Sequence, residues 1–264
     1  MLASNFIIIM DSVRHDISFV PNYRTLVSAG HSHFSRVADA LAEFIDNSIQ
    51  ACQSQPEARR IQLGLDLNYN GDEESCISIL DNGEGMDLET LSDFAVYSLD
   101  KESRGLMPSN ENSSNISKFG VGAKQAGFYL GNRIHVLTSV ADSSDILELI
   151  LDKNAIEQRF HNNEDVYKGH ITRHSAAKSL DSGFFTERKY NRRVQQMVTR
   201  LFEQKAHLSN SFTLITVQLR IDIKRKLHRE DSFKALPTQL ADIYHFHLHS
   251  ENLPNAVASR TLRK

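Results

Sequence analysis

The spacing of apolar residues predicts a helix early in the chain. Between Phe34 and Ala51, apolar side chains recur at intervals of three or four residues. This interval places them along one face of an α-helix. We also predict helices over four later segments: Leu88–Tyr97, Gly120–Leu130, 181–208 and Leu236–His249.

Strands are predicted where apolar and polar residues alternate. Apolar residues occupy every second position from Ile61 to Leu67, which is the period of a half-buried strand. Turn-forming residues fill Asn68–Glu74, and Cys76–Leu80 then predicts a second strand that pairs with the first as a hairpin. Three more segments are strand-like: Arg133–Ser139, Ile146–Leu151 and Phe212–Leu219.

The composition is that of a globular protein, with 264 residues of which 40% are hydrophobic and 24% charged. The formal net charge of −3 provides no global attraction for nucleic acid or for an anionic membrane. The two cysteines, Cys52 and Cys76, are too few for a disulfide framework, so we expect a reduced, intracellular compartment. The apolar run Phe6–Met10 is too short to span a bilayer, and we expect no membrane partner.

The first candidate for chemistry lies on the helix predicted after Phe34. Glu43 and Asn47 are four residues apart, so they share one helix face. A carboxylate there can activate a water molecule as a general base. A neutral amide oxygen one turn later can bind Mg²⁺ and leave other coordination positions for phosphates and water. Taken alone, the segment is more typical of a solvated polar stripe on an amphipathic helix.

The second candidate is the turn Asp81-Asn82-Gly83-Glu84-Gly85-Met86, which directly follows a predicted strand. The Asp81 carboxylate can accept a hydrogen bond from the exocyclic amine of adenine, whereas a guanine carbonyl would leave it unpaired. Gly83 and Gly85 allow the backbone to turn sharply and approach a flat base. Met86 offers an adaptable apolar wall for the ring. The alternative is an ordinary strand-to-helix turn.

The third candidate is the glycine-containing segment from Lys118 to Lys124, which opens a predicted helix. Free N–H groups at Gly120, Val121 and Gly122 can bind phosphate oxygens, and either terminal lysine could add positive charge. Neither a P-loop nor a complete Rossmann fingerprint is present in the sequence. The polar, aperiodic segment Asp100–Ser117 is interpreted as a lid over the nucleotide, with a disordered insertion as the alternative.

Together these motifs resemble the nucleotide-binding motifs of the GHKL superfamily, which comprises gyrase, heat-shock chaperones, histidine kinases and MutL. The residues that match are Glu43-x-x-Asp46-Asn47, Asp81-x-Gly83-x-Gly85-Met86 and Phe119-Gly120-x-Gly122. The resemblance implies the α+β Bergerat fold, a two-layer sandwich with helices on one face of a mixed, largely antiparallel sheet.

The resemblance also implies a role for individual residues. Glu43 would be the general base, Asn47 would bind Mg²⁺ and Asp81 would bind adenine. Gly120 and Gly122 would bind the phosphates of ATP.

A closer resemblance is to the ATPase module of the structural-maintenance-of-chromosomes flexible-hinge-domain-containing proteins, with the microrchidia ATPases next. It rests on five segments: Ala42–Ser48, Phe94–Leu99, Phe119–Ala126, Ala141–Asp145 and Gln239–His245. Thr213 falls where that family has a late strand, and the resemblance implies that it touches the adenine site. It further implies a nuclear protein of chromatin organisation or gene silencing, in which ATP controls dimerisation.

The expected organisation is one ATPase domain with short flanking segments. We expect an N-terminal extension, the GHKL domain, and a C-terminal helix and tail that leads toward a transducer-like domain: 1–20, 21–235 and 236–264. Chromatin or nucleic acid would be contacted through regions absent from this chain. The family's transducer-like domain supplies a lysine to the γ-phosphate, and no such segment can be placed here.

Two function classes therefore stay open: a slow, Mg²⁺-dependent ATPase, and a catalytically weak module that dimerises when ATP binds. A histidine kinase is less well supported, because no phosphoacceptor helix precedes the motifs. His245, His247 and His249 alternate, but on a helix they would not converge on a metal. The basic residues between Lys189 and Arg229 are interrupted by acidic ones and favour a solvated surface over a phosphate-binding stripe.

Overall fold

The structure is a computed structural model that describes most of the chain. The described residues are 33–54, 58–68, 75–95, 122–166, 168–176, 180, 182–207 and 210–245. Four features of the sequence prediction lie outside them: the extension 1–20, the segment Asp100–Ser117, the residues Lys118, Gly120 and Val121, and the histidines His247 and His249.

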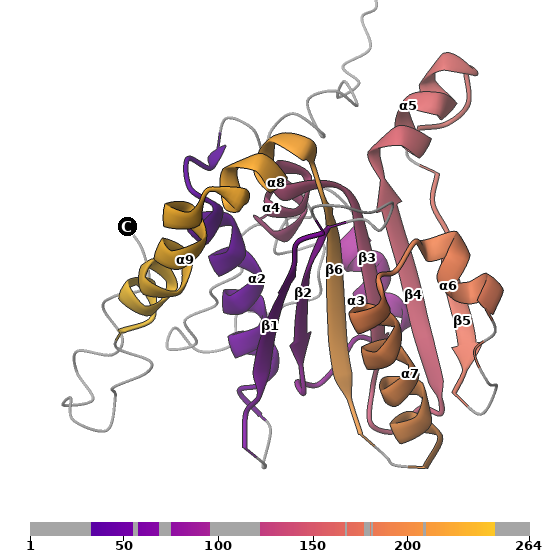
Figure 1. Cartoon of the computed structure of the whole chain (residues 1–264). Helices are drawn as coiled ribbons and strands as arrows, with labels where there is room; N and C mark the ends of the chain where they lie inside the picture. Colours follow the sequence, from indigo (N-terminus) through magenta and orange to yellow (C-terminus); the bar gives the residue numbers. More distant parts are fainter. Residues whose placement is uncertain are drawn as a thin grey trace, which may run out of the picture.

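A six-stranded sheet forms the centre of the molecule (Figure 1). Its strands are β1 (Ile61–Asp66), β2 (Cys76–Asp81), β3 (Gly131–Ser139), β4 (Asp145–Asp152), β5 (Ile171–Ser175) and β6 (Phe212–Leu219). Their order is β1-β2-β6-β3-β4-β5, and every neighbouring pair is antiparallel. The predicted hairpin of β1 and β2 is confirmed, and β6 enters the sheet between β2 and β3.

Helices account for most of the remaining described residues. They are α2 (Val37–Ala51), α3 (Leu88–Ala95), α4 (Gly122–Leu130), α5 (Lys153–His161), α6 (Ser182–Arg188), α7 (Arg192–His207), α8 (Ile221–His228) and α9 (Glu230–Ile243). No helix in this part of the chain is both long and apolar enough to cross a bilayer.

Three elements escaped the sequence prediction, and each has a weak apolar pattern. Edge strand β5 carries only one strongly apolar side chain, Ile171. Helix α5 buries no residue and starts because the Asp152 side chain accepts hydrogen bonds from the backbone N–H groups of Asn154 and Ala155. Helix α8 presents only Ile223 and Leu227 to the core. Helix α9 also begins six residues before the predicted Leu236.

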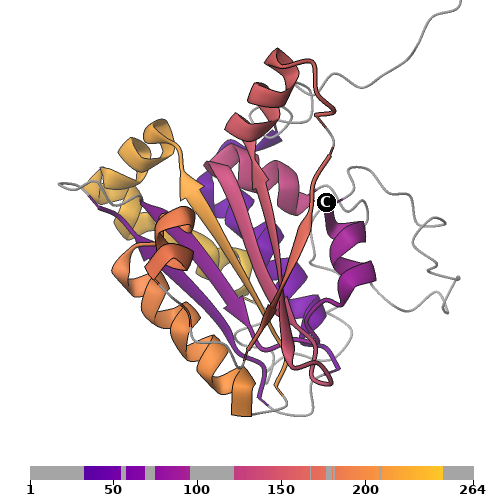
Figure 2. The ribbon, with the colours of Figure 1, turned by 90° about the vertical axis from the view of Figure 1, so that its right-hand side faces the viewer.

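The first face of the sheet is covered by α2 and α4, with α3, α8 and α9 beside them (Figures 1 and 2). One continuous apolar cluster joins these helices to the odd-numbered residues of β2 and β6 and to the even-numbered residues of β3. Leu41 and Phe44 of α2 and Ile134 of β3 are almost completely buried in it. The predicted α+β sandwich is confirmed by this layer of helices on an antiparallel sheet.

The second face of the sheet is covered as well, by α6 and α7 (Figures 1 and 2). Leu137, Ile146 and Leu214 point to this side and pack against Val194 and Val198 of α7. The sequence predicted helices on one face only, whereas the strands are apolar on both faces. Such strands must be buried on both sides, so α6 and α7 add a third layer.

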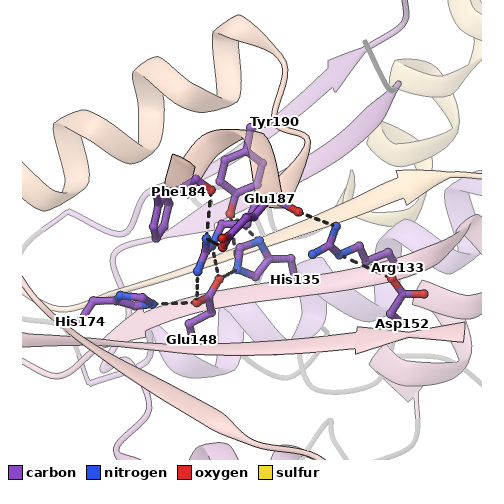
Figure 3. A network of polar contacts seen from close by, with 9 residues as sticks. Arg133, His135, Glu148, Asp152, His174, Phe184, Glu187 and Tyr190 are labelled. Carbon is purple, nitrogen blue, oxygen red and sulfur yellow. Dashed lines mark hydrogen bonds and ion pairs between the residues drawn. The ribbon is translucent and has the colours of Figure 1, made fainter. Parts of the chain in front are cut away.

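A buried polar network fixes α6 to this second face (Figure 3). The Glu148 carboxylate of β4 accepts two hydrogen bonds from Arg188, at 2.5 and 2.6 Å. Its oxygens also lie 2.6 Å from His135 Nε2 and 2.7 Å from His174 Nε2. The Tyr190 hydroxyl lies 2.5 Å from His135 Nδ1. Both contacts of His135 are hydrogen bonds if the neutral ring donates from Nε2 to Glu148 and accepts a hydrogen bond from the Tyr190 hydroxyl at Nδ1.

The network shifts the titration of its members. Burial alone would raise the pKa of the Glu148 carboxyl group, but hydrogen bonds from His135, His174 and Arg188 outweigh it and hold that pKa well below its usual value. Burial lowers the pKa of His135, because an imidazolium ion would lose its hydration there, and the neighbouring Glu148 opposes this effect only in part. The folded chain therefore favours charged Glu148 and neutral His135.

Replacing Glu148 should be strongly destabilising. Glu148→Gln leaves the Arg188 charge buried without its carboxylate, which costs about 3–5 kcal/mol of the free energy of unfolding. The matched control is Glu157→Gln on α5, whose side chain is 43% exposed and 3.8 Å from Lys153; it should cost about 0.5 kcal/mol or less. Urea unfolding measures both, and equal small losses would contradict the role of the network.

Stability should also fall as the pH is lowered. A group whose pKa is lower in the folded chain than in the unfolded chain stabilises the fold at pH values above its unfolded pKa. This stabilisation is lost as the pH falls, because the unfolded chain then binds the proton more readily. For His135 the loss begins near 6.5, the ordinary pKa of histidine. Urea unfolding between about pH 7.5 and about pH 5.5 should show a decline of up to about 1.4 kcal/mol per pH unit.

The variant His135→Gln isolates this contribution of His135. Glutamine can donate to Glu148 and accept from Tyr190, but it does not titrate. The pH slope of its stability should therefore be shallower than that of the wild-type chain. An identical slope in the two proteins would mean that His135 is not the source of the pH dependence.

Candidate functional site

The end of β2 and the C-terminal half of α2 meet at a buried aspartate. Asp81 is the last residue of β2 and is 4% exposed. Its Oδ2 accepts a hydrogen bond from the Ser48 hydroxyl of α2 at 2.8 Å, and its Oδ1 accepts one from the backbone N–H of Gly83 at 3.0 Å. These two bonds hold the carboxylate in one orientation beside α2.

Burial raises the pKa of Asp81, because the charged carboxylate loses hydration. Hydrogen bonds from Ser48, Gly83 and Thr213 oppose that rise. A buried carboxylate with a raised pKa is typical of functional sites, although structural sites show it too. Asp81 is thus a desolvated acceptor. A ligand that donates a hydrogen bond to it would be strongly favoured over a ligand that does not.

Two threonines complete this side of the site. Thr213 of β6 lies opposite Asp81 in the β2–β6 register. Its hydroxyl is 3.1 Å from that of Thr138 on β3, and Thr138 Oγ1 donates to the Phe212 carbonyl at 2.9 Å. Thr138 Oγ1 also accepts the backbone N–H of Met86 at 2.8 Å. Thr138, a residue the sequence analysis missed, therefore links the predicted Met86 to Thr213, which lies beside Asp81 in the sheet.

Neighbouring atoms leave no room for a side chain at the two glycines of the turn, Gly83 and Gly85. A Cβ at Gly83 would lie 2.7 Å from the Ala51 Cβ of α2. Gly85 has a φ of +72°, and a Cβ there would lie 2.1 Å from the Ser139 carbonyl oxygen. The turn is therefore pressed between α2 and the end of β3, and only glycine fits at Gly85.

The predicted catalytic pair lies on the α2 face that meets α4. Glu43 and Asn47 are both half-buried, one turn apart. A Cβ at Gly122, the first residue of α4, would lie 2.3 Å from Glu43 Oε2. The carboxylate is therefore in contact with the backbone of the predicted phosphate-binding segment. The structure thus brings Glu43, Asn47 and Gly122 together from separate parts of the chain.

Asp46, between these two residues, faces a different partner. The Tyr244 hydroxyl, just after α9, lies 2.6 Å from Asp46 Oδ1 and 3.0 Å from the Ala42 carbonyl oxygen. Asp46 is 6% exposed. This contact anchors α2 to the C-terminal helix and leaves Glu43 and Asn47 on the adjacent face.

Lys124, a predicted phosphate ligand, is buried between α3 and α4. It is 1% exposed, its Nζ donates a hydrogen bond to the Phe94 carbonyl, and it lies 5.1 Å from the centre of the Phe94 ring. Most of α4 is buried, so this helix position faces the core. In this structure Lys124 holds α3 against α4, and its role as a phosphate ligand stays a prediction. Lys118, Gly120 and Val121 lie outside the described residues.

The residues present suit one type of metal. Within the described ranges, no group of three or more His, Cys, Asp or Glu side chains could hold a metal ion by itself. Mg²⁺ does not need such a cage, because it is usually bound by one or two protein oxygens together with phosphates and water. A half-buried Asn47 amide beside Glu43 fits this requirement.

Comparison with known proteins agrees with this geometry. Residues 35–182 match the family described as "Histidine kinase-, DNA gyrase B-, and HSP90-like ATPase". The chain is also 30% identical to Structural maintenance of chromosomes flexible hinge domain-containing protein 1 from Homo sapiens over 261 residues, and to the Mus musculus protein of that name over 260 residues. These alignments cover 92% and 91% of the chain but only 12% of each relative.

The family match covers more than half of the chain and contains every element of the site except Thr213 and Tyr244. It includes α2, the turn after Asp81, and α4. The chain therefore belongs to the histidine kinase-, DNA gyrase B- and HSP90-like ATPases, the GHKL superfamily.

Proposed function

We propose that this chain binds ATP together with Mg²⁺ between α2, the Asp81–Met86 turn and α4, and hydrolyses it slowly. The observation that carries the proposal is the buried, fixed Asp81 carboxylate at one end of α2. Glu43 lies against Gly122 farther along the same helix. The adenine-binding acceptor is thus hydrogen-bonded to α2, and the candidate general base lies on the same rigid helix.

In this proposal Asp81 selects the base. The exocyclic amine of adenine would donate to the carboxylate, while the carbonyl of guanine would bring a second acceptor against it. A buried acceptor left without a donor costs about 1–3 kcal/mol, which corresponds to roughly five- to 150-fold in affinity. The glycine turn lets the backbone approach the ring, and Met86 lies beside Thr138 at its edge.

Asn47 would provide the protein oxygen for Mg²⁺. When bound, the metal would offset negative charge on the phosphates. Glu43 would accept the proton of the attacking water as a general base, for which proximity to Gly122 and the start of α4 is the supporting observation. The N-terminus of α4 would face the phosphates with its free N–H groups.

The wider role is proposed from the two relatives, whose name refers to the maintenance of chromosomes. We propose that the chain acts in chromatin or chromosome organisation in the nucleus and that two copies pair when ATP binds. Because the chain spans 12% of each relative, contacts with chromatin are proposed to involve regions beyond the matched part.

Two substitutions should separate binding from turnover. Glu43→Ala should lower phosphate release by roughly 100-fold or more, the usual contribution of a general base, and spare ATP affinity. Asp81→Ala should weaken ATP binding by roughly tenfold or more. Calorimetry with ATP and Mg²⁺ measures affinity, and phosphate release measures turnover.

Asp39→Asn, one turn before Glu43 on α2, is the matched control for this pair. Asp39 bonds with Arg36 and should leave binding and turnover unchanged. Equal turnover in the wild-type and Glu43→Ala chains would contradict the mechanism. If ATP binds but no variant or wild-type chain releases phosphate, the nucleotide-controlled dimerisation module becomes the better reading.

Gly122→Ala tests the contact between α2 and α4. The new methyl group would displace the Glu43 carboxylate, which is the mobile end of a side chain, so stability should change by about 1 kcal/mol or less. Moving the general base by about 1 Å should lower turnover by roughly 100-fold. Unchanged turnover in a chain with wild-type ATP affinity would show that this contact has no catalytic role.

A further inference from the structure

A small polar cavity lies on the face of the sheet opposite the proposed ATP site. Its floor is formed by neighbouring strands: Cys76 of β2 pairs with Gln218 of β6, which pairs with Arg133 of β3. The segment from Arg188 to Asn191, between α6 and α7, lines its other side. Nothing in the proposed ATP mechanism uses these residues.

Arg133 is only weakly paired in this cavity. Its side chain is 15% exposed, and its Nε is 3.8 Å from Asp152, beyond hydrogen-bonding distance. Its Nη1 makes one long hydrogen bond of 3.5 Å, to the Glu187 carbonyl oxygen (Figure 3). A guanidinium group has five N–H donors, and a largely buried one is unfavourable unless acceptors reach it.

Arg188 differs from Arg133 in this respect. Its guanidinium group donates two short hydrogen bonds to the Glu148 carboxylate of β4. Its position on the cavity wall nevertheless adds positive charge close to Arg133. Strand β3 and helix α6 therefore present one weakly paired and one strongly paired guanidinium to the same space.

The rest of the lining supplies donors and no negative charge. Lys189, Asn191, Thr216 and Gln218 all carry N–H or O–H groups. Among the described residues, no carboxylate lines the cavity. The acidic partners of the two arginines, Glu148, Glu187 and Asp152, lie outside the lining. Such a set of donors is suited to an oxyanion, because arginine binds phosphate and carboxylate oxygens through its planar fork.

The space is small. A water molecule can be centred over about 30 Å³ of it, and one buried water requires about 10–15 Å³. The cavity thus has room for two or three waters, or for one compact oxyanion in their place. A nucleotide does not fit there.

We propose that this cavity binds a small free oxyanion of the size of phosphate or sulfate, held mainly by Arg133. The anion would accept hydrogen bonds from the Arg133 guanidinium that lines the cavity, and would link the β3 and β6 strands to the α6–α7 connection. The site is independent of the proposed ATP site, which lies on the other face of the sheet.

Cys76 gives this proposal a local readout. Its thiol lines the cavity and accepts a hydrogen bond from Asn191 Nδ2 at 3.2 Å. The second cysteine of the chain, Cys52, is 0% exposed on the other side of β2 and serves as an internal control. An anion in the cavity would cover Cys76 and slow its reaction with a small, uncharged maleimide.

The experiment measures the maleimide labelling rate of Cys76 in the full chain, with inorganic phosphate or with chloride at equal ionic strength. Phosphate at ten times its Kd should slow labelling by roughly tenfold, since about one site in eleven is then free. Chloride should have little effect, and Cys52 labelling should not respond to either salt. Equal rates in phosphate and chloride overturn the proposal, leaving a water-filled cavity.

Variants assign the effect to Arg133. Arg133→Gln should lose the protection by phosphate, while Arg193→Gln should keep it. Arg193 also contacts an aspartate, Asp66, at 3.3 Å, but its side chain is 62% exposed and lies outside the cavity lining. Protection that persists in Arg133→Gln overturns the proposal. If that variant does not fold, Arg133→Lys replaces it and should show weaker protection than the wild-type chain.

The Asp81→Ala chain separates this site from the ATP site. It should retain protection of Cys76 by phosphate even where ATP binding is lost. Loss of both together would place the anion in the nucleotide site and would contradict an independent cavity. Failure of ATP binding alone leaves the cavity result standing.

Discussion

The hydrogen bond between Ser48 and Asp81 is the constraint on which the candidate site depends. It joins the C-terminal half of α2 to the end of β2 inside the protein, at 2.8 Å. Because Asp81 also accepts the Gly83 N–H, the same carboxylate sets the position of the helix and the path of the turn. The general-base candidate Glu43 is on that helix, so its place against Gly122 follows from the same contact.

The sheet separates two polar environments that serve different purposes. On the first face, polar groups lie at the edge of the apolar cluster, around the Asp81 turn. On the second face, Glu148 is surrounded by donors from β3, β5 and α6 and is 2% exposed. Such a network fixes one arrangement of the helices, because any partner left alone would be a buried, unsatisfied group.

The sequence was sufficient for the features that depend on neighbouring residues. Glu43 with Asn47, and Asp81 with its glycines, are local patterns, and the structure places them at adjoining elements. It was insufficient where contacts join distant segments. Nothing in the sequence distinguishes Thr138 from other strand residues, because its contacts depend on the pairing of β3 with β6. The network of Glu148 with His135 and Arg188 joins residues that are far apart in the chain. Lys124 was predicted from its place after a glycine, whereas the burial of α4 determines where its ammonium lies.

Selection of adenine by the Asp81 carboxylate can be tested by comparing the binding of two nucleotides. Calorimetric titrations of the wild-type chain with ATP and with GTP, each with Mg²⁺, differ only in the base. The account predicts that ATP binds at least about tenfold more tightly than GTP, because guanine presents an acceptor to a buried acceptor. Equal affinities, or tighter binding of GTP, would contradict it.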